Sequence, residues 1–164
     1  MPSELASKLH PDCTPVAWML GSWRGNGHGH YPTIEKFHHT EELVVSHDGR
    51  PFLSYVSRAW LIDDHAEKIR PAASESGFLR CRPGGEIEMV LAHSTGVVEV
   101  WSGRMDGRRL ELVTDSVART GSAKEYVGGR RHYELLDGDL VWSMDMAAVG
   151  EPIQPHLWTR LKPD

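Results

Sequence analysis

Cysteine is scarce in this chain of 164 residues, which contains only Cys13 and Cys81. The two cysteines lie far apart in the sequence and match none of the spacings of a cysteine-based metal site. Disulfides persist in oxidising compartments, so the scarcity of cysteine favours a reducing compartment. The chain is therefore expected to be a cytoplasmic protein.

Long apolar runs are also missing, and no stretch approaches the roughly 20 residues of a membrane span. The N-terminal segment Met1–His10 lacks the apolar core of a secretion signal. The net charge of −5 argues against non-specific binding to nucleic acid. The length and the hydrophobic content of 40% indicate one soluble domain over residues 1–164, without a membrane or nucleic-acid partner and with monomer and homodimer both open.

Two common catalytic motifs are absent. No Gly-x-Ser-x-Gly elbow is present, which leaves nucleophilic catalysis with little support. The repeat Gly25-x-Gly27-x-Gly29 lacks the third-glycine spacing and the following helix of a dinucleotide site. The glycines therefore need another explanation.

Strand signals dominate the chain after a short N-terminal segment. Thr14 and Pro15 resemble an N-cap and a first helical residue, which predicts one helical turn over Val16–Leu20, while Ser3–His10 is left open between a helical turn and disorder. Beyond Leu20, no segment shows a sustained helical period, and turn residues recur at short intervals. The expected strands are 21–30, 33–47, 52–62, 68–82, 86–93, 97–104, 109–118, 122–136, 139–149 and 155–161.

These segments predict an all-β fold. Short connections favour antiparallel neighbours in sequence order, and about ten such strands leave no free edge only when the sheet closes. We therefore expect an antiparallel up-and-down β-barrel similar to lipocalins and fatty-acid-binding proteins. A barrel of more than about eight strands has room inside for a ligand.

The first expected strand carries glycine at every second position over Gly25, Gly27 and Gly29, here called the glycine stripe, with Gly21 in the same phase. Alternate residues share one face of a strand, so the stripe presents no side chains. Such glycines usually mark a bend or a close approach to the backbone. Trp23 in the same strand is expected to plug one end of the barrel, with Arg160 covering its ring through a cation–π contact.

The chain has ten histidines, and most of them allow a plain structural explanation. His28 and His30 share one strand face, a spacing that a zinc site can use, but no further ligand joins them and exposed polar residues explain them better. His38 and His39 point to opposite faces. His93 follows an apolar run, which suits either a pocket mouth or local hydrogen bonding beside a turn.

The last strand contains His156, directly after Pro155. Strict alternation puts His156, Trp158 and Arg160 on one face, opposite Leu157, Thr159 and Leu161. A lone histidine on a strand is either a ligand or a structural residue, and the pattern alone leaves both open. Met144 and Met146 share a strand face, where they either pack in the core or fill space beside a flat ligand.

Several segments together resemble the nitrobindin family of haem-binding β-barrels, and the match spans most of the chain. The family signature Gly-x-Trp-x-Gly-x-Gly corresponds to Gly21, Trp23, Gly25 and Gly27. The other similar segments are Gly29–Ile34, Glu75–Arg80, Leu91–Gly96, Ala123–Glu125, Asp137–Leu140 and Met146–Leu157, the last being similar to the haem-ligating segment.

The resemblance implies a ten-stranded barrel that holds one ferric haem b, with His156 as the axial ligand of the iron. It also implies that Thr40 and Lys124 lie near the haem, with Lys124 suited to a propionate, that His93 lines the opposite side, and that Met146 belongs to the haem segment. Ala72–Ser74 departs from relatives with larger residues there.

The implied activity is isomerisation of peroxynitrite to nitrate, together with binding of nitric oxide. The sequence alone leaves two alternatives open, a haem carrier or nitric oxide sensor without turnover, and a carrier of fatty acids or similar apolar molecules.

Overall fold

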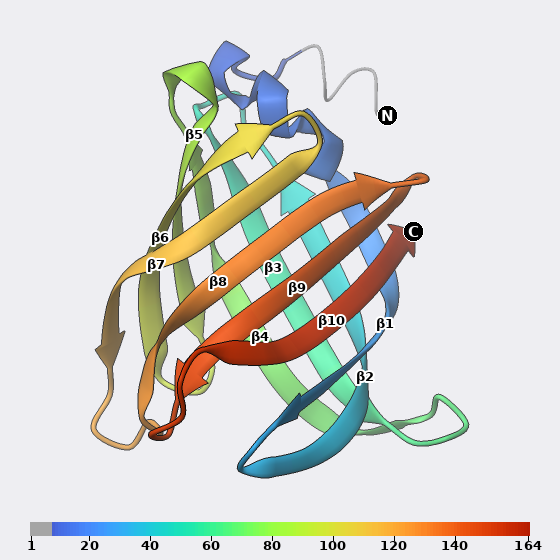
Figure 1. Cartoon of the computed structure of the whole chain (residues 1–164). Helices are drawn as coiled ribbons and strands as arrows, with labels where there is room; N and C mark the ends of the chain where they lie inside the picture. The colour runs from blue at the N-terminus through green and yellow to red at the C-terminus, as the bar shows by residue number, and fades with distance from the viewer. Residues whose placement is uncertain (1–7) are drawn as a thin grey trace.

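The chain folds into a closed barrel of ten antiparallel strands in a computed structural model, which describes residues 8–164 (Figure 1). Each strand pairs with its neighbours in the sequence, and the first strand closes the barrel by pairing with the last. The strands are β1 (Gly21–Tyr31), β2 (Ile34–Ser46), β3 (Phe52–Ile62), β4 (Lys68–Cys81), β5 (Glu86–His93), β6 (Val97–Asp106), β7 (Arg109–Arg119), β8 (Tyr126–Leu136), β9 (Asp139–Ala148) and β10 (Gln154–Pro163).

The barrel confirms the expected fold class and strand order. The largest difference is at β8, which begins at Tyr126 and not at Ser122. A turn precedes this strand, in which the amide of Ala123 donates to the carbonyl of Thr120, so residues 120–125 form a loop. Turn bonding inside one short segment overrode the strand pattern there.

A short 3₁₀ helix, η1 (Pro11–Met19), precedes the barrel. The expected start at Thr14 and Pro15 is wrong, because Pro11 already occupies the first turn and the side chain of His10 caps the helix by accepting from the amide of Asp12. Histidine is not among the usual capping residues, so the predicted start of the helix came later in the chain. Most of the segment Ser3–His10 lies outside the described residues.

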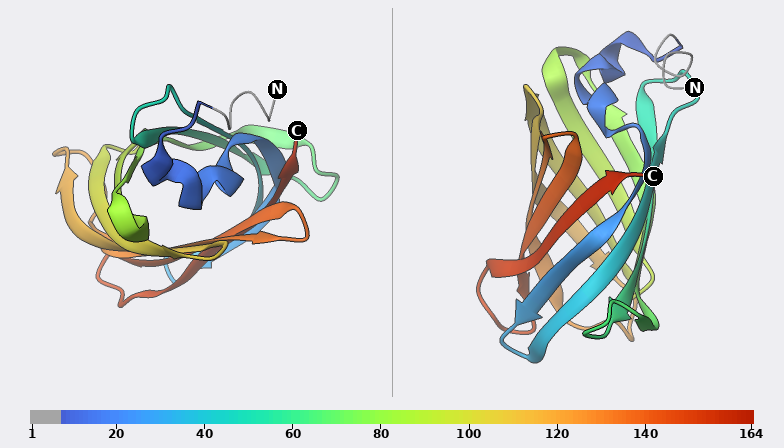
Figure 2. Two further views of the ribbon diagram at one scale, coloured as in Figure 1. Left: turned by 90° about the horizontal axis from the view of Figure 1, so that it is seen from above. Right: turned by 90° about the vertical axis from the view of Figure 1, so that its right-hand side faces the viewer.

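Helix η1 lies across one end of the barrel, here called the closed end (Figure 2). Its buried side chains join those of Trp23 and Cys81 in the hydrophobic core. A second short 3₁₀ segment, η2 (Pro83–Gly85), lies at the same end. The opposite end, here called the far end, is where β1, β5 and β9 finish and β10 begins.

Trp23 is buried at the closed end, and its indole nitrogen donates to the carbonyl of Met19 at 2.9 Å. The expected cation–π contact with Arg160 is wrong. Arg160 is on the outer face of β10, where it bonds to Asp139 at 2.7 Å. Arg160 points outward because it follows the buried Thr159 in the strand. The residue that holds Trp23 in place is instead Met19 of η1.

The interior changes character along the barrel axis. Near η1 it is filled by apolar side chains, whereas its middle contains buried charged groups. The guanidinium of Arg131 lies 5.2 Å from the ring centres of both Trp101 and Trp142, which cover it. Buried charges persist in a protein when they are paired and hydrogen-bonded, so this interior region is built around specific partners.

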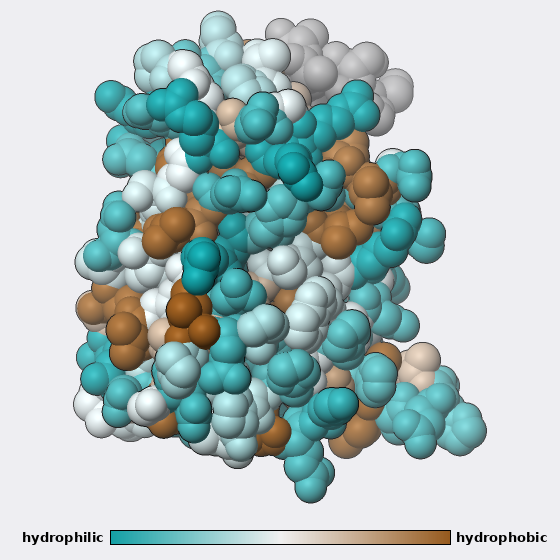
Figure 3. Space-filling view, in the orientation of Figure 1, coloured by the Kyte–Doolittle hydropathy of each residue, from teal (hydrophilic) through white to brown (hydrophobic). Residues whose placement is uncertain are grey.

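No helix among the described residues is long and apolar enough to cross a membrane. On the face shown in Figure 3, hydrophobic side chains form separate patches among hydrophilic ones. Apolar atoms normally contribute a large part of the exposed surface of a folded protein, so these patches need no special explanation.

Candidate functional site

The glycine stripe lies on the inner face of β1, and the structure shows what occupies its space. A Cβ atom on Gly25 or Gly27 would lie 2.0 or 2.1 Å from a backbone oxygen of β10. A Cβ on Gly29 would lie 2.5 Å from the ring of Phe37, and the Cβ on Gly27 would also lie 2.8 Å from the ring of His39. The missing side chains of the glycine stripe therefore leave room for the backbone of β10 and for two aromatic rings from β2.

His156 lies near the start of β10, where the pairing with β9 is irregular. Pro155 pairs with Asp145 and Leu157 pairs with Met144, so His156 is the extra residue of a β-bulge. Its ring contacts those of Tyr31 and Phe37, with centres 5.4 and 6.3 Å away. These side chains share the inner face with the glycine stripe, so the bulge turns His156 inward, and the expectation that it shares a face with Trp158 is wrong.

Tyr31 fastens this corner of the barrel. Its hydroxyl donates to the carbonyl of Met146 at 3.0 Å and accepts from the amide of Ala148 at 3.0 Å. Both partners are on β9, so the side chain of Tyr31 spans β10 from inside and joins β1 to β9. The imidazole of His156 therefore rests on a buried, hydrogen-bonded ring.

A hydrogen bond to the backbone of His30 orients the ring of His156. Its Nδ1 lies 2.9 Å from the carbonyl oxygen of His30, which can only accept, so Nδ1 carries the hydrogen. Burial lowers the pKa of His156 and favours the neutral ring. Among the described residues Nε2 has no hydrogen-bond partner, which leaves its lone pair available. This is the arrangement of a histidine that ligates a metal through Nε2.

The other residues expected near a cofactor are not all brought together. Met146 is partly buried beside the core, and Lys124 is exposed in the loop before β8, at the same end of the barrel as His156. Thr40 alternates with the buried residues His39 and Glu41, and its hydroxyl donates to the carbonyl of Gly25 at 3.1 Å. Thr40 therefore lies on the outer face of β2, away from His156.

The remaining histidines of this corner divide between the two faces. His28, His30 and His38 are on the outer face, where His28 stacks on Trp158 with ring centres 5.0 Å apart. His39 is buried, as expected from its opposite orientation to His38, and its Nε2 lies 3.0 Å from the hydroxyl of Thr159. Burial lowers the pKa of His39 to about 4, so its ring is neutral at pH 7.

A buried hydrogen-bonded chain, here called the polar cluster, was missed by the sequence analysis except for His93. Within it, Arg131 bonds Glu75 and the hydroxyl of Tyr133, and Tyr126 donates to Glu99. Its glutamates alternate with exposed residues along their strands, as core residues do. That alternation was the available signal, but charged residues are normally assigned to the outer face. The cluster consists of Tyr55, Glu75, His93, Glu99, Tyr126, Arg131 and Tyr133.

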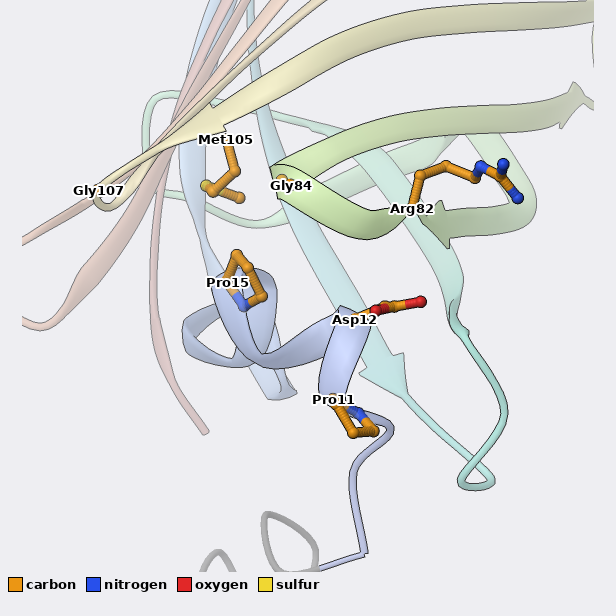
Figure 4. A pocket seen from close by; sticks show the side chains of 8 residues that line it. Pro11, Asp12, Pro15, Arg82, Gly84, Met105 and Gly107 are labelled. Atoms are coloured by element: carbon orange, nitrogen blue, oxygen red, sulfur yellow. The ribbon is translucent and has the colours of Figure 1, made fainter.

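A surface pocket of about 330 Å³ lies at the closed end (Figure 4). Its lining includes Asp12 and Pro15 of η1, Arg82, and Met105 of β6. These residues supply no imidazole and lie at the opposite end from His156. The pocket is therefore not the cofactor site that His156 indicates.

Fold and site together define a β-barrel protein with an inward imidazole suited to a metal-centred cofactor. The donor chemistry fits haem, because a neutral histidine anchored through Nδ1 is a common axial ligand and the aromatic rings of Tyr31 and Phe37 contact it. Residues 12–162 match the family described as the THAP4-like, heme-binding beta-barrel domain, and the chain belongs to that family. The resemblance to haem-binding barrels is thereby confirmed.

Similar proteins carry two kinds of name. A protein of Nocardioides sp. strain JS614 named peroxynitrite isomerase is 60% identical over 161 residues, which are 98% of each chain. A ferric nitrobindin-like protein of Cutibacterium acnes is 37% identical over 164 residues, 99% of each chain. The crystal structure of Rv2717c from M. tuberculosis superposes with a TM-score of 0.86 at 37% identity, covering 95% of this chain and 99% of that one.

Proposed function

We propose that this chain is a peroxynitrite isomerase that binds one haem b through Nε2 of His156. Support comes from the family and from the name of the relative that is 60% identical over nearly the whole chain. The observation that carries the proposal is the 2.9 Å hydrogen bond from Nδ1 of His156 to the carbonyl of His30. It fixes both the tautomer and the direction of the free nitrogen.

Haem bound at His156 would supply a Lewis-acidic iron at which peroxynitrite can rearrange to nitrate. The protein's own residues prepare this position. The bulge at His156 directs the ring inward, where it contacts the rings of Tyr31 and Phe37. Because the hydrogen bond to His30 restricts ring rotation, the lone pair is oriented before the cofactor arrives.

The rest of the site is proposed from its placement. Met146 is partly buried next to the carbonyl that holds Tyr31, where its flexible side chain suits the edge of a flat ligand. Lys124 is exposed at the far end, where its ammonium can pair with a haem propionate. His93 reaches the same end from the polar cluster. Thr40 is left out of the proposed site, since its hydroxyl is bonded on the outer face.

The wider biological setting is also proposed. We expect the ferrous haem form to bind nitric oxide, and we expect one haem-binding domain over residues 1–164, acting as a monomer or a homodimer. We also propose a cytoplasmic location, because a chain with only two cysteines favours a reducing compartment.

Haem loading of the purified protein tests the assignment of the ligand. On addition of haemin, the wild type should develop a Soret band, and His156→Ala should lose at least tenfold in haem affinity because the iron loses its protein ligand. His38→Ala is the matched control, since its ring is on the outer face of the same corner. Equal haem affinity in wild type and His156→Ala would overturn the assignment.

Stopped-flow kinetics test the activity. Peroxynitrite decay should accelerate with haem-loaded wild type and yield nitrate, while the haem-free protein should give the uncatalysed rate. A Soret band without acceleration would indicate a haem carrier or sensor. Co-purified lipid without Soret absorbance would indicate an apolar carrier.

Lys124→Ala should weaken haem binding only slightly. An exposed ion pair contributes up to about 1 kcal/mol, which corresponds to roughly a fivefold change in affinity. Lys36→Ala at the start of β2 serves as a control for the general loss of positive charge. A titration of both variants with haemin checks this, and a loss common to both would argue against a specific role for Lys124.

A further inference from the structure

His93 is the most exposed of the three central members of the polar cluster. It ends β5 at the far end of the barrel, and 17% of its side chain is exposed, compared with 9% for Glu75 and 0% for Glu99. His93 thus connects a fully buried carboxylate with the end of the barrel at which His156 is found.

The two ring nitrogens of His93 have different environments. Nε2 lies 2.6 Å from Oε2 of Glu99, a short hydrogen bond between a histidine and a carboxylate. An ionised carboxylate only accepts, so Nε2 carries the hydrogen. Glu99 also accepts from the hydroxyl of Tyr126, which holds the carboxylate in place.

Nδ1 of His93 is the less restrained nitrogen. Its nearest acidic atom, Oε2 of Glu75, is 3.4 Å away, beyond the usual length of such a hydrogen bond. Glu75 is already paired with Arg131, which donates to both of its oxygens. In the neutral ring, the lone pair of Nδ1 therefore accepts no strong hydrogen bond. The carboxylates of Glu75 and Glu99 would stabilise a proton placed on Nδ1.

An imidazole oriented by a buried carboxylate through one nitrogen, with the other nitrogen facing a carboxylate that is already paired with an arginine, is an arrangement suited to general acid–base chemistry. We propose that His93 accepts the proton of protic ligands that enter the far end of the barrel, with Glu99 and Tyr126 as positioning residues. The substrate part of this inference rests on the proposed function, for which the protic ligand is peroxynitrous acid, the conjugate acid of peroxynitrite.

The proton step balances without a further reactant. The O–H bond of peroxynitrous acid breaks, an N–H bond forms at Nδ1 of His93, and peroxynitrite remains as the anion. No electrons change hands. Nitrate then leaves as an anion, and His93 returns its proton to solvent at the partly exposed far end.

The first test is the pH profile of peroxynitrite isomerisation by the haem-loaded protein. In His93→Gln, which cannot take up a proton, the rate should follow the fraction of substrate already present as the anion. In the wild type, the rate near pH 6 should exceed that of the variant by about tenfold, less than the roughly 10²–10⁴-fold typical of a general base because only the protonated substrate needs the step. Identical pH profiles would overturn the inference.

The second test uses cyanide and does not depend on isomerisation. Hydrogen cyanide must lose its proton to bind ferric haem as the anion, so His93→Gln should slow its association about tenfold near pH 7. Azide, which is already an anion at this pH, should change less than about twofold. An equal slowing of both ligands would show that the variant merely altered the pocket.

His132→Gln is the matched control. His132 also lies between two glutamates, with nitrogens 3.6 Å from Glu111 and 3.3 Å from Glu134, but on the outer face of β8. It should leave both profiles unchanged. Glu99→Gln, which keeps an acceptor for Nε2 and removes the charge, should slow hydrogen cyanide less than His93→Gln does.

A spectroscopic measurement covers the case in which the variants fold poorly. Nitrogen-15 NMR of the full-length wild type near pH 8 should show His93 with its hydrogen on Nε2 and none on Nδ1. The opposite tautomer would overturn the inference. Wild type that fails to isomerise peroxynitrite, yet shows the cyanide effect, would refute the proposed function and leave the proton acceptor in place.

Discussion

At the scale of single residues, the unusual feature of this barrel is the glutamate Glu41. It is 1% exposed and accepts hydrogen bonds from Ser57 at 2.9 Å and from the indole of Trp142 at 3.0 Å. Burial, followed by the nearby charge of Glu75, raises the pKa of Glu41 to about 7. Its protonation state therefore changes close to neutral pH, inside a protein core.

This pKa predicts a pH-dependent stability. Because the folded-state pKa is above the unfolded value near 4.5, the folded state gains stability from protonated Glu41 at low pH and loses that gain as pH rises through about 7. Between pH 5 and pH 8, the wild type should lose on the order of 2 kcal/mol relative to Glu41→Gln. Urea unfolding at several pH values measures the difference.

The exposed Glu111→Gln is the control for that experiment and should keep the wild-type pH slope, since its side chain is 77% exposed. A Glu41→Gln protein whose stability changes with pH as steeply as the wild type would show that another group is responsible.

At the scale of elements, β1 shows how far a pattern can be interpreted. The glycine stripe indicated a close approach to the backbone, and this was correct. Which group approaches was not predictable, because the answer depends on the coiling of β10 and on the rings of Phe37 and His39 from β2. Contacts between strands that are distant in sequence leave no periodic signal in either one.

The glycine stripe yields a stability prediction. Gly27→Ala should destabilise the fold by about 2 kcal/mol or more, since its methyl group would lie 2.1 Å from the carbonyl oxygen of Trp158 and 2.8 Å from the ring of His39. Thermal and urea unfolding measure the loss. Gly121→Ala is the control, because a Cβ there meets nothing within 4 Å, and its stability should stay within about 0.5 kcal/mol of the wild type.

The element that carries the proposed ligand was the hardest to predict. Strict alternation along β10 put His156 on the face of Trp158 and Arg160, which the structure shows to be the outer one, and only a β-bulge of one residue turned His156 inward. Pro155 marks the place, but proline alone does not specify a bulge. The family resemblance identified His156 where the strand period did not. Glu75, Glu99 and Arg131 follow the alternation of core residues, but they were missed because charged residues are normally assigned to the outer face.

At the scale of the whole molecule, the barrel separates two chemical environments along its axis. Apolar packing and η1 are at the closed end, while His156, Lys124 and His93 are at the far end. Ten strands paired in sequence order are a simple arrangement to predict, and turn chemistry was enough for the topology. The polar cluster between the two ends could be identified only from the structure.

Haem binding should stabilise the entire barrel. At free haem of about 100 times the dissociation constant, the gain is about 2.7 kcal/mol. For a domain of this size, that corresponds to a rise in melting temperature of roughly 5–10 °C. At tenfold lower affinity, His156→Ala should gain only about 1.4 kcal/mol under the same conditions, about half of the wild-type rise or less, and His38→Ala should behave as the wild type. Differential scanning calorimetry with and without haemin provides the comparison.

The two ends of the barrel also bear on how such a protein survives its own chemistry. Cys13 of η1 and Cys81 of β4 are buried at the closed end, and burial raises the pKa of both thiols, so neither is a ready thiolate. The packed interior separates both thiols from a molecule bound near His156. Under the proposed function, this separation would protect both thiols from oxidation by peroxynitrite.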